Sequence, residues 1–294
     1  MKKKPHVSIV LVNYNGEKDT IECVESLSKI TYENYSIIVV DNGSNKGNIR
    51  CNSRINELAD VIILSSNLGF SGGNNKGIEY ALKKYDSEYI LLLNNDTLVE
   101  KDFLDKLVYA AEDNPNAIIG GTIYYEYDRS LIWYAGGEFI KDTALTIHCR
   151  YNEHMMKNTL SSRDVTFITG CLMLIPKEVI SKVGLLPEEH FLYFEDADYC
   201  CSALEKNIRL LYCSTAVIYH KVNASAKTNS PVQNYYMVRN GLYMVRKYSH
   251  HKWKGYARIF RKEAKRCLRK SNSFKMLCIS TYDFLMGRQG KATF

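Results

Sequence analysis

The chain has 294 residues, 46% of them hydrophobic, and a formal net charge of +7. That length allows one large domain with an appendage or two small domains, and the composition is ordinary for a globular protein. No apolar run approaches the ~18 residues that a membrane-spanning helix needs. The basic start at residues 1–4 precedes an apolar stretch that is too short for a signal peptide and has no cleavage site, so we expect a cytoplasmic protein.

The positive charge is concentrated near the C-terminus. Residues 246–275 contain twelve Lys or Arg and one acid, which gives this segment a charge of +11 and leaves −4 on the rest. This distribution indicates that the basic segment meets an anionic partner. The nine cysteines are scattered, with no Cys-x-x-Cys pair, so reduced thiols are expected.

The first part of the chain alternates apolar runs with amphipathic segments. Buried strands are expected at residues 7–12, 37–40, 61–64 and 89–93, and helices at about 19–29 and 72–82. This alternation predicts an α/β fold with a mainly parallel sheet covered by helices on both faces.

Each of these strands ends in polar residues. Because the carboxyl ends of parallel strands lie side by side, these residues are expected to form one polar crevice that suits a nucleotide. They are Asn13 and Asn15, then Asp41 and Ser44, then Asn67 and Gly69, then Asn94, Asn95 and Asp96.

The group Asn94-Asn95-Asp96 follows the strand at 89–93 directly. A carboxylate flanked by amides is a hard oxygen site, suited to Mg²⁺ or Mn²⁺ shared with phosphate oxygens. The alternative is a polar turn in which Asp96 or Thr97 caps the next helix.

The second part of the chain has a different order of elements. A helix is expected near residues 103–111, then strands at 118–125, 139–147 and 165–175. A helix then runs from Pro176 to Gly184, another ends near residue 207, and strands follow at 209–213 and 217–219.

Three acids follow an aromatic run at residues 191–194: Glu195, Asp196 and Asp198. A carboxyl buried near other acids has a raised proton affinity and can act as a general base. The alternative is a helix N-terminus, where the helix dipole favours acidic side chains.

Two further side chains are candidates for the crevice. His220 follows the strand at 217–219 directly, and we place it at the metal site because that site lies at such strand ends. Arg239 lies beside Tyr235 and Tyr236 on an expected helix, and its guanidinium suits a diphosphate. The alternative for Arg239 is a surface salt bridge.

The basic segment has helical spacing. Its apolar side chains form one stripe, while Lys and Arg cover the rest of the helix; the stripe comprises Trp253, Tyr256, Phe260, Ala264 and Leu268. Such a helix can lie in the interface of an anionic membrane. The alternative is a solvated helix that packs on the body by the same stripe.

Several common motifs are absent from the sequence. There is no G-x-G-x-x-G fingerprint, no Walker A lysine motif, no G-x-S-x-G and no His-Glu-x-x-His. A nicotinamide-binding site is therefore not predicted, and no nucleic-acid partner is expected.

The ordered series of motifs resembles glycosyltransferase family 2, and within it the rhamnosyltransferase-like branch. The resemblance spans about residues 7–243 and implies the GT-A fold, a mixed, mainly parallel sheet flanked by helices. It rests on Val-Leu-Val-Asn-Tyr-Asn at 10–15, Val-Val-Asp-Asn-Gly-Ser at 39–44, Asn-Leu-Gly-Phe-Ser-Gly-Gly-Asn-Asn at 67–75, Leu-Asn-Asn-Asp at 93–96, Gly-Cys-Leu-Met at 170–173, Phe-Glu-Asp-Ala-Asp at 194–198 and Tyr-His at 219–220.

The resemblance also implies roles for individual residues. Asp41 would bind the pyrimidine base, with Asn13 and Asn67 near the nucleoside. Asn95 and Asp96 match the last two positions of the family's DxD motif, Asp96 as the main metal ligand, while Asn94 stands where the family often has Asp. The remaining expected substrate contacts are Asn15, Gly72, Asn74, Trp133, Glu195, Asp198 and Arg239.

Asp196 matches the family's catalytic base, and Glu195 or Asp198 is the fallback. His220 would lie on the metal or the diphosphate. Trp133, Phe191 and Tyr193 are candidates for stacking on the acceptor sugar, and core packing is the alternative for each.

The sequence therefore predicts a metal-dependent inverting glycosyltransferase. The expected donor is dTDP-rhamnose or a UDP-sugar, and the expected acceptor is a glycan or lipid-linked glycan at the inner face of the plasma membrane. Residues 1–245 would form the GT-A domain and residues 246–294 a basic helical segment. The alternatives are a sugar-phosphate nucleotidyltransferase and a non-catalytic protein that binds nucleotide sugars or glycans.

Overall fold

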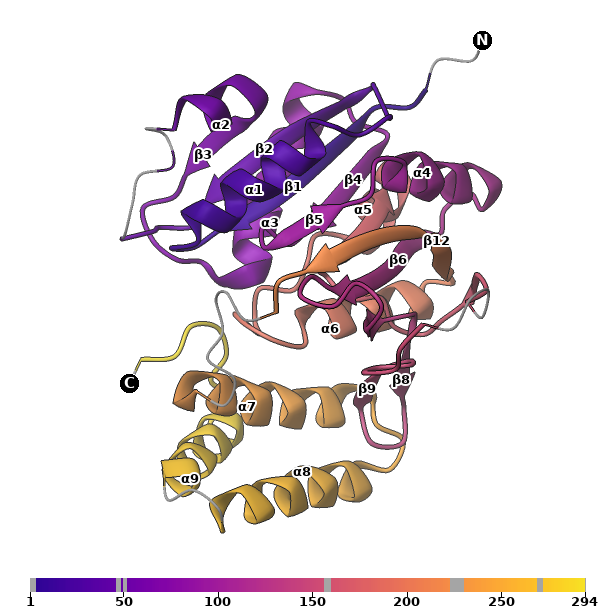
Figure 1. Cartoon of the computed structure of the whole chain (residues 1–294). Helices are drawn as coiled ribbons and strands as arrows, with labels where there is room; N and C mark the ends of the chain where they lie inside the picture. Colours follow the sequence, from indigo (N-terminus) through magenta and orange to yellow (C-terminus); the bar gives the residue numbers. More distant parts are fainter. Residues whose placement is uncertain are drawn as a thin grey trace.

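A computed structural model describes residues 4–45, 49, 52–155, 160–222, 230–268 and 272–293, with the side chains of residues 272 and 273 left out. Its centre is a mixed sheet, and Figure 1 shows helices packed around it with three C-terminal helices gathered at one end. The described residues contribute ten strands to this sheet.

The first half of the sheet is parallel, as expected. Strand β1 (Val7–Asn13) lies between β2 (Tyr35–Asp41) and β4 (Tyr89–Leu93), and β3 (Asp60–Ile63) follows β2. All of these neighbours pair in the parallel direction. Their carboxyl ends therefore lie along one edge of the sheet.

The second half mixes directions. Strand β11 (Leu172–Pro176) runs antiparallel between β4 and β6 (Ile118–Tyr125), and β12 (Leu210–His220) is parallel to β6. Three short strands complete this half: β5 (Thr97–Val99) and β10 (Arg163–Asp164) pair with β12, and β7 (Ile132–Tyr134) pairs with β6.

Six helices precede the C-terminal segment within the described residues: α1 (Glu17–Leu27), α2 (Ser53–Leu58), α3 (Gly69–Lys84), α4 (Phe103–Asp113), α5 (Lys177–Val183) and α6 (Glu195–Glu205). Helix α3 approaches the sheet closely through its glycines. A Cβ at Gly77 would lie 2.3 Å from Cγ1 of Val10, so only glycine fits there. Gly77, in the middle of α3, thus allows the helix to pack closely on the sheet.

Four expected strands differ in the structure. Residues 139–147 form a hairpin, β8 (Gly137–Ile140) with β9 (Leu145–His148), because the chain reverses at Ala144, whose φ is +50°. The strand expected from 165 begins only at Leu172. Residues 165–167 instead bond to Leu210 and Gly137 outside a ladder. The segments at 209–213 and 217–219 are one strand, β12, with an irregularity between Cys213 and Val217.

The C-terminal segment contains α7 (Pro231–Tyr248), α8 (Lys252–Cys267) and α9 (Asn272–Leu285), which pack against one another (Figure 1). The boundary expected at residue 245 lies in the last turn of α7, and the division into two domains stays a prediction. None of the described helices is both long and apolar enough to span a bilayer.

Candidate active site

Asp96 and His220 meet at the edge of the sheet where the parallel strands end. Asp96 follows β4, and His220 is the last residue of β12, which pairs with β5 so that His220 lies opposite Thr97. The His220 Nε2 and Asp96 Oδ1 atoms are 3.1 Å apart, and both side chains are buried. Asn94 approaches the same ring nitrogen, with its Nδ2 at 3.5 Å.

The two groups favour each other's charged form. Burial disfavours an imidazolium, but Cys171 and Asp96 outweigh it and raise the pKa of His220 well above its ordinary value. Burial would likewise raise the pKa of Asp96, yet the hydrogen bond and charge of His220 hold that pKa below its usual range.

The donor set at this point fits Mg²⁺ or Mn²⁺. A carboxylate oxygen is the ligand that these cations favour, and Mg²⁺ is usually held by one or two carboxylates together with water and substrate phosphates. The imidazole Nε2 points at the same place and would hold an ion only in its neutral form, so metal binding would displace the proton shared with Asp96, while His220 Nδ1 is buried with no partner among the described residues. Asp96 and His220 are therefore the side chains that would hold such an ion.

The residues expected around the nucleoside lie along the same edge. Asn13 and Asp41 end β1 and β2 and are register partners. Ser44 links them, because its backbone N–H donates to Asp41 Oδ1 (3.0 Å) and its hydroxyl accepts from Asn13 Nδ2 (3.2 Å). Asn15 joins the group through its own N–H, 2.9 Å from Ser44 Oγ. These contacts fix a polar wall at the ends of β1 and β2.

Asn67 is positioned by Asn42, a residue missing from the expected site. The Asn42 amide donates to Asn67 Oδ1 (3.2 Å) and to the Gly69 carbonyl (2.8 Å), and its oxygen accepts from the Leu68 N–H (2.9 Å). The available signal was its place directly after Asp41 in the Asp-Asn-Gly-Ser turn.

Three other residues that were expected to contact the substrate, Asn95, Asn74 and Gly72, have structural roles within the protein. Asn95 donates to the Thr20 hydroxyl (2.8 Å) and so ties the end of β4 to α1. Asn74 donates to the Phe70 carbonyl (2.9 Å), one turn earlier in α3. A Cβ at Gly72 would lie 2.6 Å from Leu68 Cβ, so this glycine allows the first turn of α3 to close.

Asp196 stands in the first turn of α6 and is partly exposed. Its Oδ2 accepts from the Gly170 N–H (3.0 Å) and its Oδ1 from the Ala197 N–H (2.8 Å). Burial raises the pKa of Asp196 above its ordinary value, although these hydrogen bonds oppose the shift. A partly accessible carboxylate with raised proton affinity is suited to accept a proton.

The segment Gly170–Cys171 connects Asp196 with the Asp96 centre. The Gly170 N–H binds Asp196, and the next carbonyl, that of Cys171, accepts from the Asn94 N–H at 3.0 Å. Since Asn94 is two residues before Asp96, the two carboxylates flank one short stretch of backbone. The structure thus brings the candidate metal ligand and the candidate base to the same edge.

The two fallback bases have other surroundings. Burial raises the pKa of Glu195 to about 8, with the Asp196 charge adding to it, and Glu195 Oε2 has no hydrogen-bond partner among the described residues. Burial also acts on Asp198, but hydrogen bonds from His190, Lys247 and Tyr248 lower its pKa to about 2. Asp198 is thereby committed to an ion-paired cluster with α7.

Arg239 is fully buried and holds backbone together. Its guanidinium donates to the carbonyls of Gly290 (2.8 Å) and His190 (3.1 Å) and to the side chains of Asn240 and Tyr235. Both expectations for Arg239, a contact with the diphosphate and a surface salt bridge, are wrong. Among the residues that the structure describes, Arg239 forms no ion pair, and its hydrogen bonds occupy the donors that a diphosphate would use.

Trp133 lies beside the metal-site histidine. Its ring meets His220 edge-on with centroids 4.7 Å apart, and it meets His148 of β9 in the same way at 4.6 Å. The indole is half-buried, so part of its surface remains open beside the Asp96 centre.

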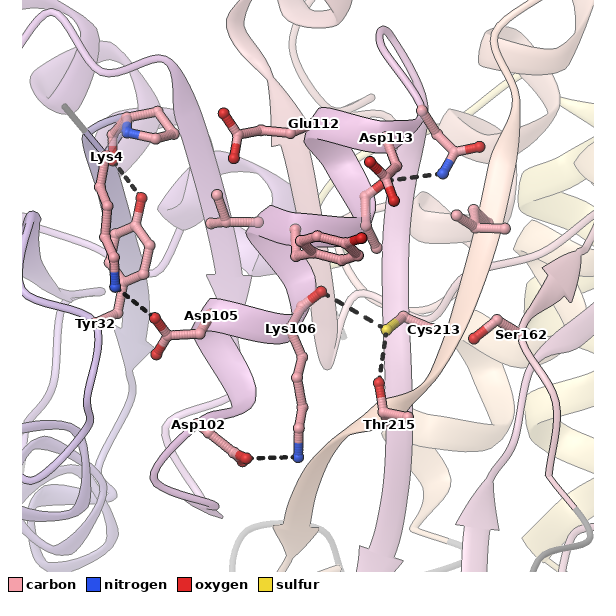
Figure 2. A pocket seen from close by; sticks show the side chains of 16 residues that line it. Lys4, Tyr32, Asp102, Asp105, Lys106, Glu112, Asp113, Ser162, Cys213 and Thr215 are labelled. Carbon is pink, nitrogen blue, oxygen red and sulfur yellow. Dashed lines mark hydrogen bonds and ion pairs between the residues drawn. The ribbon is translucent and has the colours of Figure 1, made fainter. Parts of the chain in front are cut away.

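A separate hollow lies away from this site. Figure 2 shows it lined by α4, by Lys4 and Tyr32, and by residues near the start of β12, with a volume of about 690 Å³. Its charged groups pair with each other, Lys4 with Asp105 and Lys106 with Asp102, each at 2.7 Å. None of the expected site residues lines it.

Comparison with known proteins agrees with this geometry. The model of the family described as "Glycosyl transferase family 2" matches residues 8–184. A dTDP-rhamnosyl transferase, RfbF of Shigella flexneri, is 28% identical over 254 residues, which cover 82% of this chain and 80% of that protein. The rhamnosyltransferase WbbL of Escherichia coli is 26% identical over 214 residues, covering 70% and 80%.

Solved structures share the fold at low identity. GalNAc-T7, crystallised with UDP, GalNAc and Mn²⁺, superposes with a TM-score of 0.60 at 16% identity, over 82% of this chain and 51% of its own. The mannosyltransferase PcManGT of Pyrobaculum calidifontis, in complex with GDP-Man and Mn²⁺, gives 0.57 at 13% identity, over 95% and 74%. The chain thus spans about half of the GalNAc-T7 chain.

The mixed sheet, the polar strand ends and the match over residues 8–184 lead to one conclusion: this chain belongs to glycosyl transferase family 2, has the GT-A fold, and is a glycosyltransferase similar in sequence to rhamnosyltransferases.

Proposed function

We propose that the protein is an inverting hexosyltransferase. It transfers rhamnose or a similar hexose from a dTDP- or UDP-sugar to a hydroxyl of a glycan or lipid-linked glycan. The observation that carries this proposal is the Gly170–Cys171 segment, which has Asp196 bonded on one side and the strand end of Asp96 on the other. The similarity to a dTDP-rhamnosyl transferase supports dTDP-rhamnose as the first donor to test.

Asp196 supplies the base. An acceptor hydroxyl attacks well only as its proton leaves, and a carboxylate with raised proton affinity accepts that proton in the transition state, a contribution of ~10²–10⁴-fold. Attack on the anomeric carbon from the side opposite the leaving nucleotide inverts that centre. Glu195 and Asp198 are less suited, because one is buried and the other is ion-paired.

Asp96 and His220 hold the nucleotide end. A divalent cation between them and the diphosphate would offset the negative charge that develops on the leaving group. Asp41, Asn13 and Asn67 bind the nucleoside along the ends of β1 and β2 and in the loop that leads to α3. Asn94 approaches His220 and helps to orient it.

The test uses a panel of nucleotide sugars with Mg²⁺ or Mn²⁺, scored by released nucleoside diphosphate. We expect slow hydrolysis of one dTDP- or UDP-sugar that stops when the metal is chelated.

Asp196→Asn should bind the nucleoside diphosphate as wild type does while transfer falls ~10²–10⁴-fold. Transfer above a tenth of the wild-type rate would remove Asp196 from the role of base, and Glu205→Gln, at the far end of the same helix, serves as control.

We also propose that α8 docks on the anionic inner face of the plasma membrane. The inner side of α8 buries Gly255, Ile259 and Glu263, whereas Trp253 and Phe260 are exposed. Of the aromatic stripe, Tyr256 packs on the body, with its ring 6.1 Å from that of Phe284 in α9, while Trp253 and Phe260 face away from it. A groove along its outer side is lined by Trp253, Lys254, Ala257, Arg258, Arg261, Lys262 and Lys265.

The charges of this groove are not neutralised within the protein. None of its five cations forms an ion pair with another described residue. Arg258, Lys262 and Arg266 follow one another at four-residue spacing on α8, so these like charges lie on the same side of the helix and repel one another. Phosphate headgroups would relieve this repulsion, while Trp253 and Phe260 would enter the interface.

A further inference from the structure

A chain of aromatic rings leads from the metal-site histidine to the protein surface. Trp133 contacts both His220 and His148, and His148 contacts Tyr151 with ring centroids 6.1 Å apart. The rings of Tyr151 and Tyr125 are 6.4 Å apart, and those of Tyr125 and Tyr127 are 5.1 Å apart. The chain begins buried and ends exposed, since Tyr151 is 50% and Tyr127 65% accessible.

Two loops that are bonded to each other carry these rings. One follows β6 and contains Tyr127, and the other follows β9 and contains Tyr151. Backbone hydrogen bonds join them: Ile132 N–H to the Glu153 carbonyl (2.9 Å), Asn152 N–H to the Ile132 carbonyl (2.9 Å), and Met155 N–H to the Ser130 carbonyl (2.8 Å). The backbone segments that carry the exposed rings are therefore tied to each other.

Polar groups lie on the same two loops as the exposed rings. The Tyr125 hydroxyl donates to Asn152 Oδ1 at 2.8 Å, which places an amide between the two loops. Arg129 lies over the ring of Tyr219 at 4.3 Å, and Asp128 accepts from the Ser130 hydroxyl at 2.7 Å. Flat apolar faces bordered by hydrogen-bonding groups match a pyranose ring, which has an apolar C–H face and a rim of hydroxyls.

The position of these rings in the sheet separates them from the nucleoside. Tyr125 ends β6 and is the register partner of His220, whereas Asp41 ends β2, and β11, β4 and β1 lie between β6 and β2. A donor with its base at Asp41 and its diphosphate at Asp96 would extend toward β6 with its sugar end. The loop with the exposed Tyr127 follows β6, so it lies beyond β4 and β11 in the order of the sheet.

We propose that Tyr127 and Tyr151, continued by Trp133, form the acceptor subsite and bind a chain of pyranose rings by stacking. This inference rests on the proposed function, because the acceptor must present a hydroxyl beside the donor sugar. The acceptor is then an oligosaccharide of more than one sugar residue. It must reach from the neighbourhood of His220 to the exposed tyrosines, which are connected to His220 only through several intervening ring contacts.

The test compares Tyr127→Ala, Tyr151→Ala and the double variant with wild type. The control is Tyr109→Ala, which removes a tyrosine of similar exposure, 68%, from the hollow in Figure 2. The probes are dTDP and UDP for the donor site, and tri- and tetrasaccharides of rhamnose, glucose, galactose and N-acetylglucosamine for the acceptor site. Binding is followed by saturation-transfer NMR.

We expect wild type to bind at least one of these oligosaccharides. Each alanine variant should raise its Kd about three- to tenfold, as loss of an aromatic contact does. Tyr127→Phe and Tyr151→Phe should keep the wild-type affinity, because stacking needs the ring and not the hydroxyl. Nucleoside diphosphate binding and donor hydrolysis should not change in any of these variants.

Oligosaccharide binding that is equal in wild type and the double variant would overturn the inference, as would the absence of binding to every oligosaccharide. Both results leave the proposed function standing if wild type still hydrolyses a nucleotide sugar. Wild-type protein that binds neither dTDP nor UDP would instead count against the proposed function itself.

Discussion

Glu195, Asp196 and Asp198 occupy the first turn of α6, and their surroundings give each carboxyl a different proton affinity. Glu195 is buried and has an oxygen without a partner, so its neutral form is favoured. Asp198 is held as a carboxylate by three hydrogen-bond donors. Asp196 lies between these extremes and is the most accessible of the three, which is why it is the residue we assign as base.

Replacing Glu195 with Gln should stabilise the protein, and more strongly as pH rises. The folded-state pKa of Glu195 is about 8, against an ordinary value of 4.5. The free energy of unfolding that this group contributes is thus fully present below pH 4.5 and declines until about pH 8. Glu195→Gln removes the titration, so its melting temperature should match that of wild type near pH 4.5 and exceed it at pH 8.

The control for this measurement is Glu205→Gln, which changes an exposed acid at the end of the same helix. Each pKa unit corresponds to about 1.4 kcal/mol, so the difference at pH 8 should amount to a few kcal/mol. A melting-temperature difference that does not change between pH 5 and pH 8 would contradict a neutral Glu195.

At the scale of elements, the turn that precedes α6 is strained and is held from α7. Phe191, Tyr193 and Phe194 have φ of +62°, +67° and +75°, a region that costs bulky residues of order 1–3 kcal/mol each. The buried amide of Asn240 lies against this turn and donates to the carbonyls of His190 (2.8 Å), Leu192 (2.9 Å) and Tyr193 (3.0 Å). Asn240 therefore positions the start of α6, and with it Asp196.

We expect Asn240→Ala to reduce transfer without changing nucleoside diphosphate binding. The substitution leaves buried carbonyls without a donor, at a cost of about 1–3 kcal/mol in stability, and lets the turn relax away from its strained geometry. The measurement is the rate of transfer at a temperature where urea titration shows the variant to be folded. Asn240→Asp should not rescue it, because a carboxylate cannot donate to these carbonyls.

Val238→Ala is the matched control. Val238 is buried on the same helix, so its truncation should lower stability by a similar amount through lost packing. If Asn240→Ala and Val238→Ala reduce transfer equally, the amide has no positioning role beyond general stability.

At the scale of the whole molecule, α7 lies between the basic helix α8 and the central sheet (Figure 1). Figure 1 shows α8 at the end remote from the strands β1 to β4. The residues after α9 bind α7 and the loop before α6, because the Gly290 carbonyl accepts from Arg239 and the Gly290 N–H donates to the Glu189 carbonyl at 2.6 Å. Removing this segment would disturb α7 as well, so substitutions in the full chain are the cleaner test.

Arg261→Glu combined with Lys265→Glu should release the protein from vesicles that contain phosphatidylserine. The change reverses two of the outward charges of α8, each worth ~1 kcal/mol at an anionic surface. Co-sedimentation is the measurement, and Lys83→Glu on α3 is the control for a change in net charge. Binding that persists in the double variant, or that is equal on neutral vesicles, would argue against an electrostatic membrane contact.

Local patterns in the sequence determined the parallel half of the sheet, the polar strand ends and the family. Runs such as Ile90–Leu93 are apolar at every position. A strand in the middle of a sheet covered on both faces buries all of these side chains, so the run favours that structure. The sequence also placed Asp96, His220 and Asp196 at the ends of elements, because each follows directly on, or close after, an apolar or aromatic run.

The tertiary structure decided what each polar side chain does there. Arg239 looked like a phosphate ligand, yet its partners are carbonyls some 50 positions away in either direction, at His190 and Gly290. Asn42 and Asn240 gave no strong signal, because their roles exist only once distant backbone segments are brought beside them. Periodicity reports which face of an element is buried, whereas the partners of a buried polar group depend on long-range contacts that no local pattern encodes.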